Sequence, residues 1–409
     1  MNNKMKPAVL LPTVNEVLNL IDDCFSFEPE AENIKIFDAL GRILATDIEA
    51  NEFVPSFNRS AMDGYSVFAN DIENASKDNP VKLVLKGEVL MGDKADFSLE
   101  HNTCIYTPTG AAVPIGTECV VMVEDTKNDN GIISIFKPTE KGKNVTLKGD
   151  DVFPGKNVFK KGRKLNISDI GALAAMGITD ILVNKKPIVG IISTGDELVQ
   201  ISDVPKDGQI RDVNSTTLAL VINQSGAIAK NYGIVKDEED VLLNVVKEAI
   251  NECDIVLISG GSSMGEKDAT EKIIESLGQL ILHGIRMKPG KPTIIGKINN
   301  KPVFGVPGHP VSAFFVSRVF VKKIILKMLG QSFDDNQIEA ILTTDVKVNK
   351  ERTVFNFVKL YKDNNTTYAT ALKTQSGLIT SMAQCDGFFA VHHDGNDLHQ
   401  GDKIIVNLF

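Results

Sequence analysis

The sequence lacks the features of secreted, membrane-spanning or disulfide-rich proteins. It has no tryptophan and only five cysteines in 409 residues. The cysteines are odd in number and never spaced as CxxC, which argues against a disulfide framework and a thiolate zinc site. No run of about 18 apolar residues occurs, so we expect no transmembrane helix. The first apolar run, Ala8 to Leu11, is too short for a signal peptide. We therefore expect a cytoplasmic protein without a membrane partner.

Positive charge is also scarce. The chain has 44 lysines and arginines against 53 acidic residues, a net charge of -9. Because proteins bind nucleic acid largely by neutralising its phosphates, this balance argues against a nucleic-acid partner. Local basic clusters still allow a small anionic ligand. The hydrophobic fraction of 43% is that of an ordinary globular protein. A chain of this length exceeds a single core, so we expect several domains.

Changes in residue pattern divide the chain into four regions. One region alternates apolar strands with amphipathic helices, which is typical of a doubly wound α/β domain with a parallel sheet. Two others consist of short β-branched runs separated by turn residues and predict small β-rich domains. The predicted regions are a discontinuous N-terminal helical and linker domain (1–53 and 156–181), a β-rich domain (54–155), the α/β domain (182–335) and a C-terminal β domain (336–409).

Three predicted strands of the α/β region end in loops of small residues. Ligands of open parallel sheets bind beyond the carboxyl ends of the strands. Small residues there let backbone N–H groups approach an anion, and a following helix adds its positive end. Each loop alone is ordinary turn punctuation, but together they predict a cradle for a phosphate-bearing ligand. The loops are Ser193-Thr194-Gly195, Gly260-Gly261-Ser262-Ser263 and Pro307-Gly308-His309-Pro310.

Acidic residues accompany the same strand ends. Glu197 follows the first loop, Asp237 follows another strand, and Asp268 opens the helix after the second loop. A carboxylate beside phosphates usually holds a divalent cation or directs water. For Asp268 considered alone, a helix N-cap is the favoured alternative.

Three further segments suggest ligand contacts. Lys288 and Lys291 flank a Pro-Gly turn, which would suit an oxyanion, although a solvated turn is the simpler interpretation. The non-periodic stretch Pro55 to Tyr65 is typical of a functional loop. The segment Lys148 to Val152 supplies paired carboxylates, for which a surface turn is the alternative.

These segments resemble one known family. NRSAMDGYSV resembles the DNSAMDGYAV signature of the MoeA and gephyrin E-domain family, whose members include molybdopterin molybdenumtransferases. Seven further motifs follow in that family's order and intervals, so the resemblance covers essentially the whole chain. They are TPTGAAVP, LKGDDV, STGDEL, GQIRDVNS, GGSSMGEKD, MKPGKP and GVPGHPVSA.

The resemblance implies a fold and an activity. It implies an elongated homodimeric subunit of four domains, whose α/β domain is similar to the molybdopterin adenylyltransferase fold. The implied reaction takes adenylylated molybdopterin and molybdate, hydrolyses the adenylyl bond with a divalent cation such as Mg²⁺, and releases AMP and molybdenum cofactor. A transient contact with a separate molybdopterin adenylyltransferase is also implied.

The family's site residues transfer to matching positions of this chain. The loops that carry Asp63 and Thr109 belong to other domains than the α/β domain, which predicts a cleft between domains or between subunits. The implied metal ligands are Glu197 and Asp268, and the ligand loop is shaped by Pro307 and Pro310. The implied active-site positions are Asp63, Thr109, Asp151, Glu197, Asp237 and Asp268. The implied molybdate positions are Lys288, Lys291, Ser312, Arg352 and Ser381.

The chain departs from the family pattern at three places. His309 stands where the ligand loop usually has asparagine, which puts a titratable ring there. Asn58-Arg59 replaces Asp-Asn, and Phe357 replaces a second arginine of the last domain. None of the three changes removes a carboxylate expected to take part in the chemistry.

Two alternatives stay open from the sequence. One is an adenylyltransferase-like or nucleotide pyrophosphatase activity on the same α/β domain. The other is a non-catalytic scaffold like the gephyrin E domain, against which the retained carboxylates argue. The sequence does not decide between molybdenum and tungsten, because their oxyanions have nearly the same size and charge, nor does it decide which divalent cation acts.

Overall fold

The computed structural model describes residues 11–260, 269–332, 336–372, 377 and 379–409. The chain forms two compact units. One contains the residues up to Glu32 together with Asn184–Phe409, and the other contains Asn33–Val183. Among the described residues, no helix is long and apolar enough to cross a membrane.

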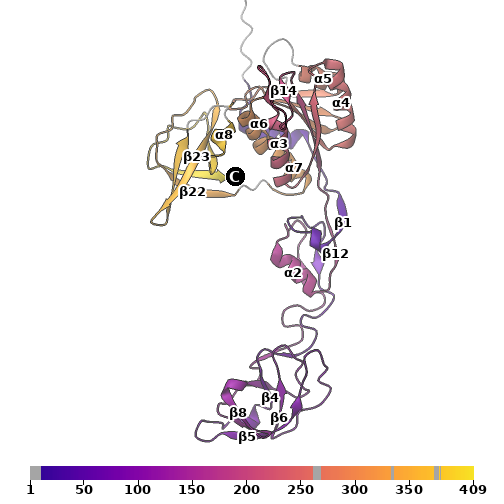
Figure 1. The fold of residues 1–409 in the computed structure, drawn as a ribbon, viewed down its shortest axis with the longest axis vertical. Helices are drawn as coiled ribbons and strands as arrows, with labels where there is room; N and C mark the ends of the chain where they lie inside the picture. Colours follow the sequence, from indigo (N-terminus) through magenta and orange to yellow (C-terminus); the bar gives the residue numbers. More distant parts are fainter. Residues whose placement is uncertain (1–10, 261–268, 333–335, 373–376, 378) are drawn as a thin grey trace, which may run out of the picture. The chain divides into compact units, whose positions relative to one another are not determined.

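A six-stranded sheet forms the centre of the α/β region in the first unit (Figure 1). Its strand order is β16-β13-β17-β21-β20-β18, and the first four strands are parallel. Strand β20 pairs antiparallel with β21, because Asn299 and Asn300, both at positive φ, make a two-residue turn between them. Strand β18 in turn pairs antiparallel with β20. The predicted α/β class is confirmed, with an antiparallel edge. The strands are β13 (Ile188–Thr194), β16 (Ile228–Val235), β17 (Ile255–Ser259), β18 (Gln279–His283), β20 (Ile294–Ile298) and β21 (Lys301–Val306).

Helices cover both faces of this sheet (Figure 1). Leu242 and Val246 of α4 and Ile273 of α5 pack against buried strand residues such as Ile258. Helix α3 packs with α6 and α7, which a π-helical turn at Ser317–Val321 joins into one rod. The helices are α3 (Val213–Gln224), α4 (Glu239–Glu252), α5 (Ala269–Leu277), α6 (Pro310–Val316) and α7 (Lys322–Met328).

The C-terminal strands of the first unit form a closed barrel. The order is β23-β24-β22-β26-β25, and β25 pairs back onto β23. Strand β19 (Met287–Lys288), from the α/β region, joins this barrel parallel to β23. Phe314 and Phe315 of α6 pack against Phe357 and Phe388 of the barrel, with ring centroids 5.0 to 6.5 Å apart. The strands are β22 (Gln337–Leu342), β23 (Thr353–Asp363), β24 (Thr366–Leu372), β25 (Gly387–Val391) and β26 (Lys403–Leu408).

The second unit contains another six-stranded sheet, in the order β7-β4-β6-β5-β9-β8. Its core includes Val67, Leu83 and Ile133. Gly64 of the SAMDGYS segment lies against the Val121 carbonyl oxygen, with which an added Cβ would clash. The strands are β4 (Gly64–Val67), β5 (Val81–Glu88), β6 (Thr103–Thr107), β7 (Cys119–Met122), β8 (Thr126–Asp129) and β9 (Ile132–Ile135).

A small helical core completes the second unit. Buried residues from 36–50 and from 152–183 pack together, including Leu44 and Leu173. Strand β2 (Ile48–Glu49) pairs with β11 (Asn157–Phe159), which joins the two segments. Helix α2 (Ile167–Ala175) lies in this core. Helix α1 (Val14–Cys24) belongs to the first unit, and a capping box between Thr13 and Glu16 stabilises its N-terminus. Strand β1 (Ala31–Lys35) pairs with β12 (Asp180–Asn184).

Asp169 anchors the start of α2. Its buried carboxylate accepts bonds from Arg163 Nε at 2.9 Å, Arg163 Nη2 at 2.8 Å and the Asn166 N–H at 3.0 Å. Asn166 Oδ1 accepts the Asp169 N–H in return. The Arg163 guanidinium lowers the pKa of Asp169 below its ordinary value. The bonds therefore stabilise the folded unit only while the carboxyl is ionised.

We predict that Asp169→Asn lowers the free energy of unfolding by about 2 kcal/mol at neutral pH, because charge-assisted bonds are lost. Since the folded-state pKa is depressed, the wild-type advantage is present above the ordinary aspartate pKa and is lost as the pH falls through the depressed one. Urea unfolding from pH 7 to pH 2.5 measures this difference. A gap between the two proteins that does not shrink with acid would contradict the assignment.

Candidate functional site

The strand ends that lead into the three predicted ligand loops lie side by side at one edge of the α/β sheet. Ser193, Ser259 and Val306 occupy matching register positions on adjacent strands. Gly260 donates its N–H to the Val306 carbonyl at 3.2 Å and has a φ of +114°. A Cβ on Gly260 would clash with the Thr194 carbonyl oxygen, so only glycine lets these backbones approach so closely. Gly308 lies next to Gly260: a Cβ added at Gly308 would be 3.9 Å from Gly260 Cα.

The side chains of the first loop are less accessible than expected for ligand contacts. Ser193 and Thr194 are buried, and Ser193 Oγ has no hydrogen-bond partner in the described part of the chain. Gly260 is half-buried, whereas Gly308 and His309 are exposed. Among these described loop residues, Gly308 and His309 are therefore the most accessible.

Two carboxylates flank the first strand end. Thr194 Oγ1 donates to Asp237 Oδ1 at 3.3 Å, which places the Asp237 loop beside the end of β13. Gly195 has a φ of +149°, and a Cβ there would lie 2.7 Å from Glu197 Oε2. The Glu197 side chain is thus folded over its own loop. Both carboxylates are exposed and can reach a ligand at this edge.

A residue outside the predicted set connects the loops. Asn214, on the first turn of α3, donates through Nδ2 to Ser259 Oγ and to the Gly308 carbonyl, both at 2.9 Å. The asparagine is 7% exposed. Sequence periodicity carries no signal for it, since a polar residue at a helix start usually caps the helix. That capping role belongs to Asp212, which accepts the Ser215 N–H at 3.1 Å.

Four of the five predicted molybdate residues line one cavity of about 1060 Å³. Lys288 and Lys291 reach it from the Pro-Gly turn, Ser312 from α6 and Arg352 from the segment before β23. His309 of the predicted ligand loop also lines it, as do Lys347 and Asn356, which were not among the predicted site residues. The cavity is therefore built from the α/β region and the barrel together.

The cavity is cationic. Within the described residues, no carboxylate pairs with Lys288, Lys291 or Lys347. Arg352 pairs with the exposed carboxylate of Glu351 at 2.9 Å, a contact that water weakens. The acidic residue of the lining, Asp345, accepts the Gln400 N–H at 2.9 Å. An anion entering the cavity would meet ammonium groups without intramolecular partners.

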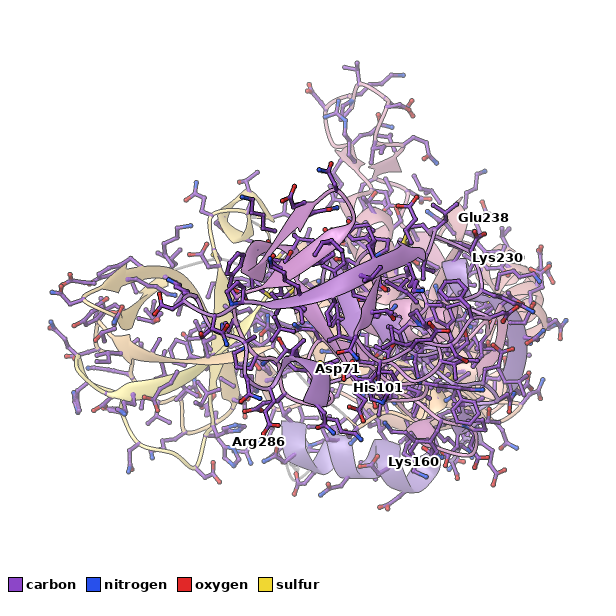
Figure 2. All side chains as sticks on the ribbon, turned by 90° about the horizontal axis from the view of Figure 1, so that it is seen from below. Asp71, His101, Lys160, Lys230, Glu238 and Arg286 are labelled. Carbon is purple, nitrogen blue, oxygen red and sulfur yellow. The ribbon has the colours of Figure 1, made fainter. Side chains whose placement is uncertain are left out.

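Arg286 fixes the turn that carries the two lysines. The arginine, labelled in Figure 2, donates Nε to the Glu351 carbonyl at 2.7 Å. Its own carbonyl accepts the Thr353 N–H at 3.0 Å. These bonds hold β19 against β23 and so place Lys288 at the barrel.

The second unit brings Asp63 and Thr109 together. Asp63 Oδ1 accepts the Thr109 N–H at 2.7 Å and the Thr109 hydroxyl at 2.9 Å. These bonds lower the pKa of Asp63, which is solvent exposed. Asp151 lies elsewhere in this unit, on the segment that pairs through Val54 and Val152. Asp151 is also exposed, and no bond to its carboxylate joins it to the other two residues.

Some predicted residues are not placed at the site. Gly261, Ser262, Ser263 and Asp268 lie outside the described residues. Ser381, on the short helix α8 (Ile379–Met382), is absent from the cavity lining. Phe357, at the position of the family's second arginine, is buried in the aromatic cluster and contributes no charge.

We predict that Thr109→Val raises the pKa of Asp63 toward that of an ordinary aspartate, because one bond to the ionised form is lost while the N–H bond stays. Carboxyl-carbon NMR titration measures the change. Thr117→Val is the matched control, since the Thr117 hydroxyl donates to the Pro114 carbonyl instead. Equal Asp63 titration in both variants would show that the hydroxyl bond has no influence.

Family models cover most of the chain. The MoeA N-terminal region, domains I and II, matches residues 12–177. A probable molybdopterin binding domain matches residues 190–327, and the MoeA C-terminal region, domain IV, matches residues 339–409.

Curated proteins and solved structures agree with these models. A putative molybdopterin biosynthesis protein of Methanocaldococcus jannaschii is 33% identical over 93% of this chain and 92% of its own length. The molybdopterin molybdenumtransferase of Bacillus subtilis is 31% identical over 94% of this chain and 91% of its own. The molybdopterin biosynthesis MoeA protein of Pyrococcus horikoshii matches with a TM-score of 0.84 and 31% identity, covering 98% of this chain and all of that one. Sequence and fold thus show that the chain belongs to the MoeA family.

Proposed function

We propose that this chain is a molybdopterin molybdenumtransferase. It takes adenylylated molybdopterin and molybdate, cleaves the phosphoanhydride with water, and releases AMP and molybdenum cofactor. Relatives of this name cover most of the chain, which supports the assignment. The main structural support is that the loop 307–310 contributes residues to two neighbouring sites. Gly308 lies at the strand edge beside Gly260, while the adjacent His309 lines the cationic cavity.

The shared loop suits a reaction with two anionic substrates. The strand edge offers backbone groups and glycines, which favour a phosphate-bearing ligand. The cavity offers Lys288, Lys291 and the Ser312 hydroxyl, which favour a tetrahedral dianion. Because the strand edge and the cavity lie on opposite sides of one loop, molybdate and the phosphate-bearing ligand would be bound close together, which the transfer requires.

A divalent cation fits the exposed carboxylates at the strand edge. Mg²⁺ prefers oxygen ligands and keeps several waters, so it is usually held by one or two carboxylates and substrate phosphates. Glu197 and Asp237 are of this kind, and we assign Asp268 to the same role from the family resemblance. The bound cation would neutralise charge on the phosphoanhydride. The chain's own backbone groups at the strand ends position the phosphates.

The proposal extends to the second unit and to partners. Asp63, Thr109 and Asp151 act in the same reaction, and the protein works as a homodimer. The adenylylated substrate comes from a separate adenylyltransferase through a transient contact. These assignments rest on the family resemblance.

We predict that Glu197→Gln lowers AMP release from adenylylated molybdopterin by roughly 10²-fold or more, because it removes a ligand of the cation that neutralises the developing phosphate charge. Asp196→Asn, one residue away and also exposed, is the matched control and should stay near wild type. The assay follows AMP and cofactor together in the presence of magnesium and molybdate. AMP release without cofactor formation in the wild type would favour a pyrophosphatase instead.

We predict that the double change Lys288→Ala and Lys291→Ala raises the molybdate concentration for half-maximal cofactor formation roughly tenfold or more, since each bond to a charged group contributes about 1.5 to 3 kcal/mol. Lys362→Ala removes an exposed lysine of the barrel that does not line the cavity, and should leave this concentration unchanged. Equal effects of the two changes would indicate a general charge effect.

A further inference from the structure

Asn214 uses both amide hydrogens on two different loops. One bond goes to Ser259 Oγ, the last residue of β17, and the other goes to the carbonyl of Gly308, in the loop after β21. An asparagine side chain has two donors, and here both are used at 2.9 Å. The amide therefore fixes the distance between the two strand ends from a third element, α3.

The bonds are shielded and the helix start is rigid. Asn214 is 7% exposed, so water competes little for Ser259 Oγ and the Gly308 carbonyl. The preceding Asp212 caps the helix through Ser215, and Arg211 Nε donates to the carbonyls of Ile201 and Asp203. These bonds leave the Asn214 side chain little freedom to move without its helix.

The two loops held by Asn214 also contact the end of β13 and the oxyanion cavity. Gly260 follows Ser259 directly and lies against the Thr194 carbonyl oxygen, at the end of β13. On the other side, Gly308 precedes His309, which lines the oxyanion cavity. A shift of the Gly308 backbone would therefore alter both the strand edge and the cavity wall.

We propose that Asn214 is a positioning residue that sets the spacing between the strand-edge ligand site and the oxyanion cavity. The inference rests on the proposed function for its catalytic consequence, whereas its effect on the loops stands independently. No other side chain of similar size supplies two donors here. Aspartate has the same shape but, when ionised, only accepts, so it would face the Gly308 carbonyl with like charge.

The chain offers a matched control on the same helix. Asn223 lies at the far end of α3, where its Oδ1 accepts the Ala229 N–H at 3.1 Å. Its removal also costs the helix one asparagine bond but touches neither ligand loop. We expect Asn214→Ala and Asn214→Asp to increase the hydrogen–deuterium exchange rates of the amides in 307–313 roughly tenfold, and Asn223→Ala to leave these rates unchanged.

Kinetics give the second readout. In the AMP-release and cofactor assay, both Asn214 variants should lose roughly 10²-fold in kcat/KM, because small displacements of positioned groups have effects of this size. Asn223→Ala should stay within about twofold. Restoration of wild-type kinetics and exchange by Asn214→Asp would overturn the proposal, since packing alone would then suffice. If the wild type releases no AMP, the proposed function fails, while altered exchange in 307–313 would still support the positioning role.

Discussion

The contact between α6 and the C-terminal barrel is the constraint on which the site depends. Phe314 and Phe315 are consecutive and both pack on barrel phenylalanines, which buries a large apolar area. The same helix carries Ser312 on the cavity and begins directly after the loop that contains Gly308. Loss of the aromatic contact would therefore separate the cationic residues of the barrel from those of the α/β region. Phe357 adds an aromatic ring to this contact, at a position where the family usually has a charged arginine.

The strand edge depends on a different kind of interaction. Close backbone approach at Gly260 and the two bonds of Asn214 hold the loops together without a large apolar surface. Such a site is sensitive to a single added methyl group or a single missing donor. In contrast, the carboxylates of Glu197 and Asp237 stand exposed at the margin. Rigid backbone and accessible charge are thus supplied by separate residues, which suits the proposed binding of phosphates by the backbone and of a cation by the carboxylates.

Much of the fold could be predicted because local pattern determines it. The alternation of apolar strands and amphipathic helices predicted the α/β domain. The sheet's antiparallel edge was not predicted, although Asn299 and Asn300 are a turn signal. Small residues after three strands predicted a shared ligand edge, because parallel strands all end on the same side.

The sequence by itself determined the types of chemistry that are available: glycine loops, exposed carboxylates and a lysine pair at a rigid turn. Tertiary structure decided which of them meet. Lys347 and Arg352 join Lys288 at one cavity only because β19 pairs with β23, a contact between segments some 65 residues apart. The role of Asn214 likewise arises from bonds across 45 and 94 residues. No local pattern encodes such pairs, since hydrogen bonds and charge proximity depend on distances that only the folded chain fixes.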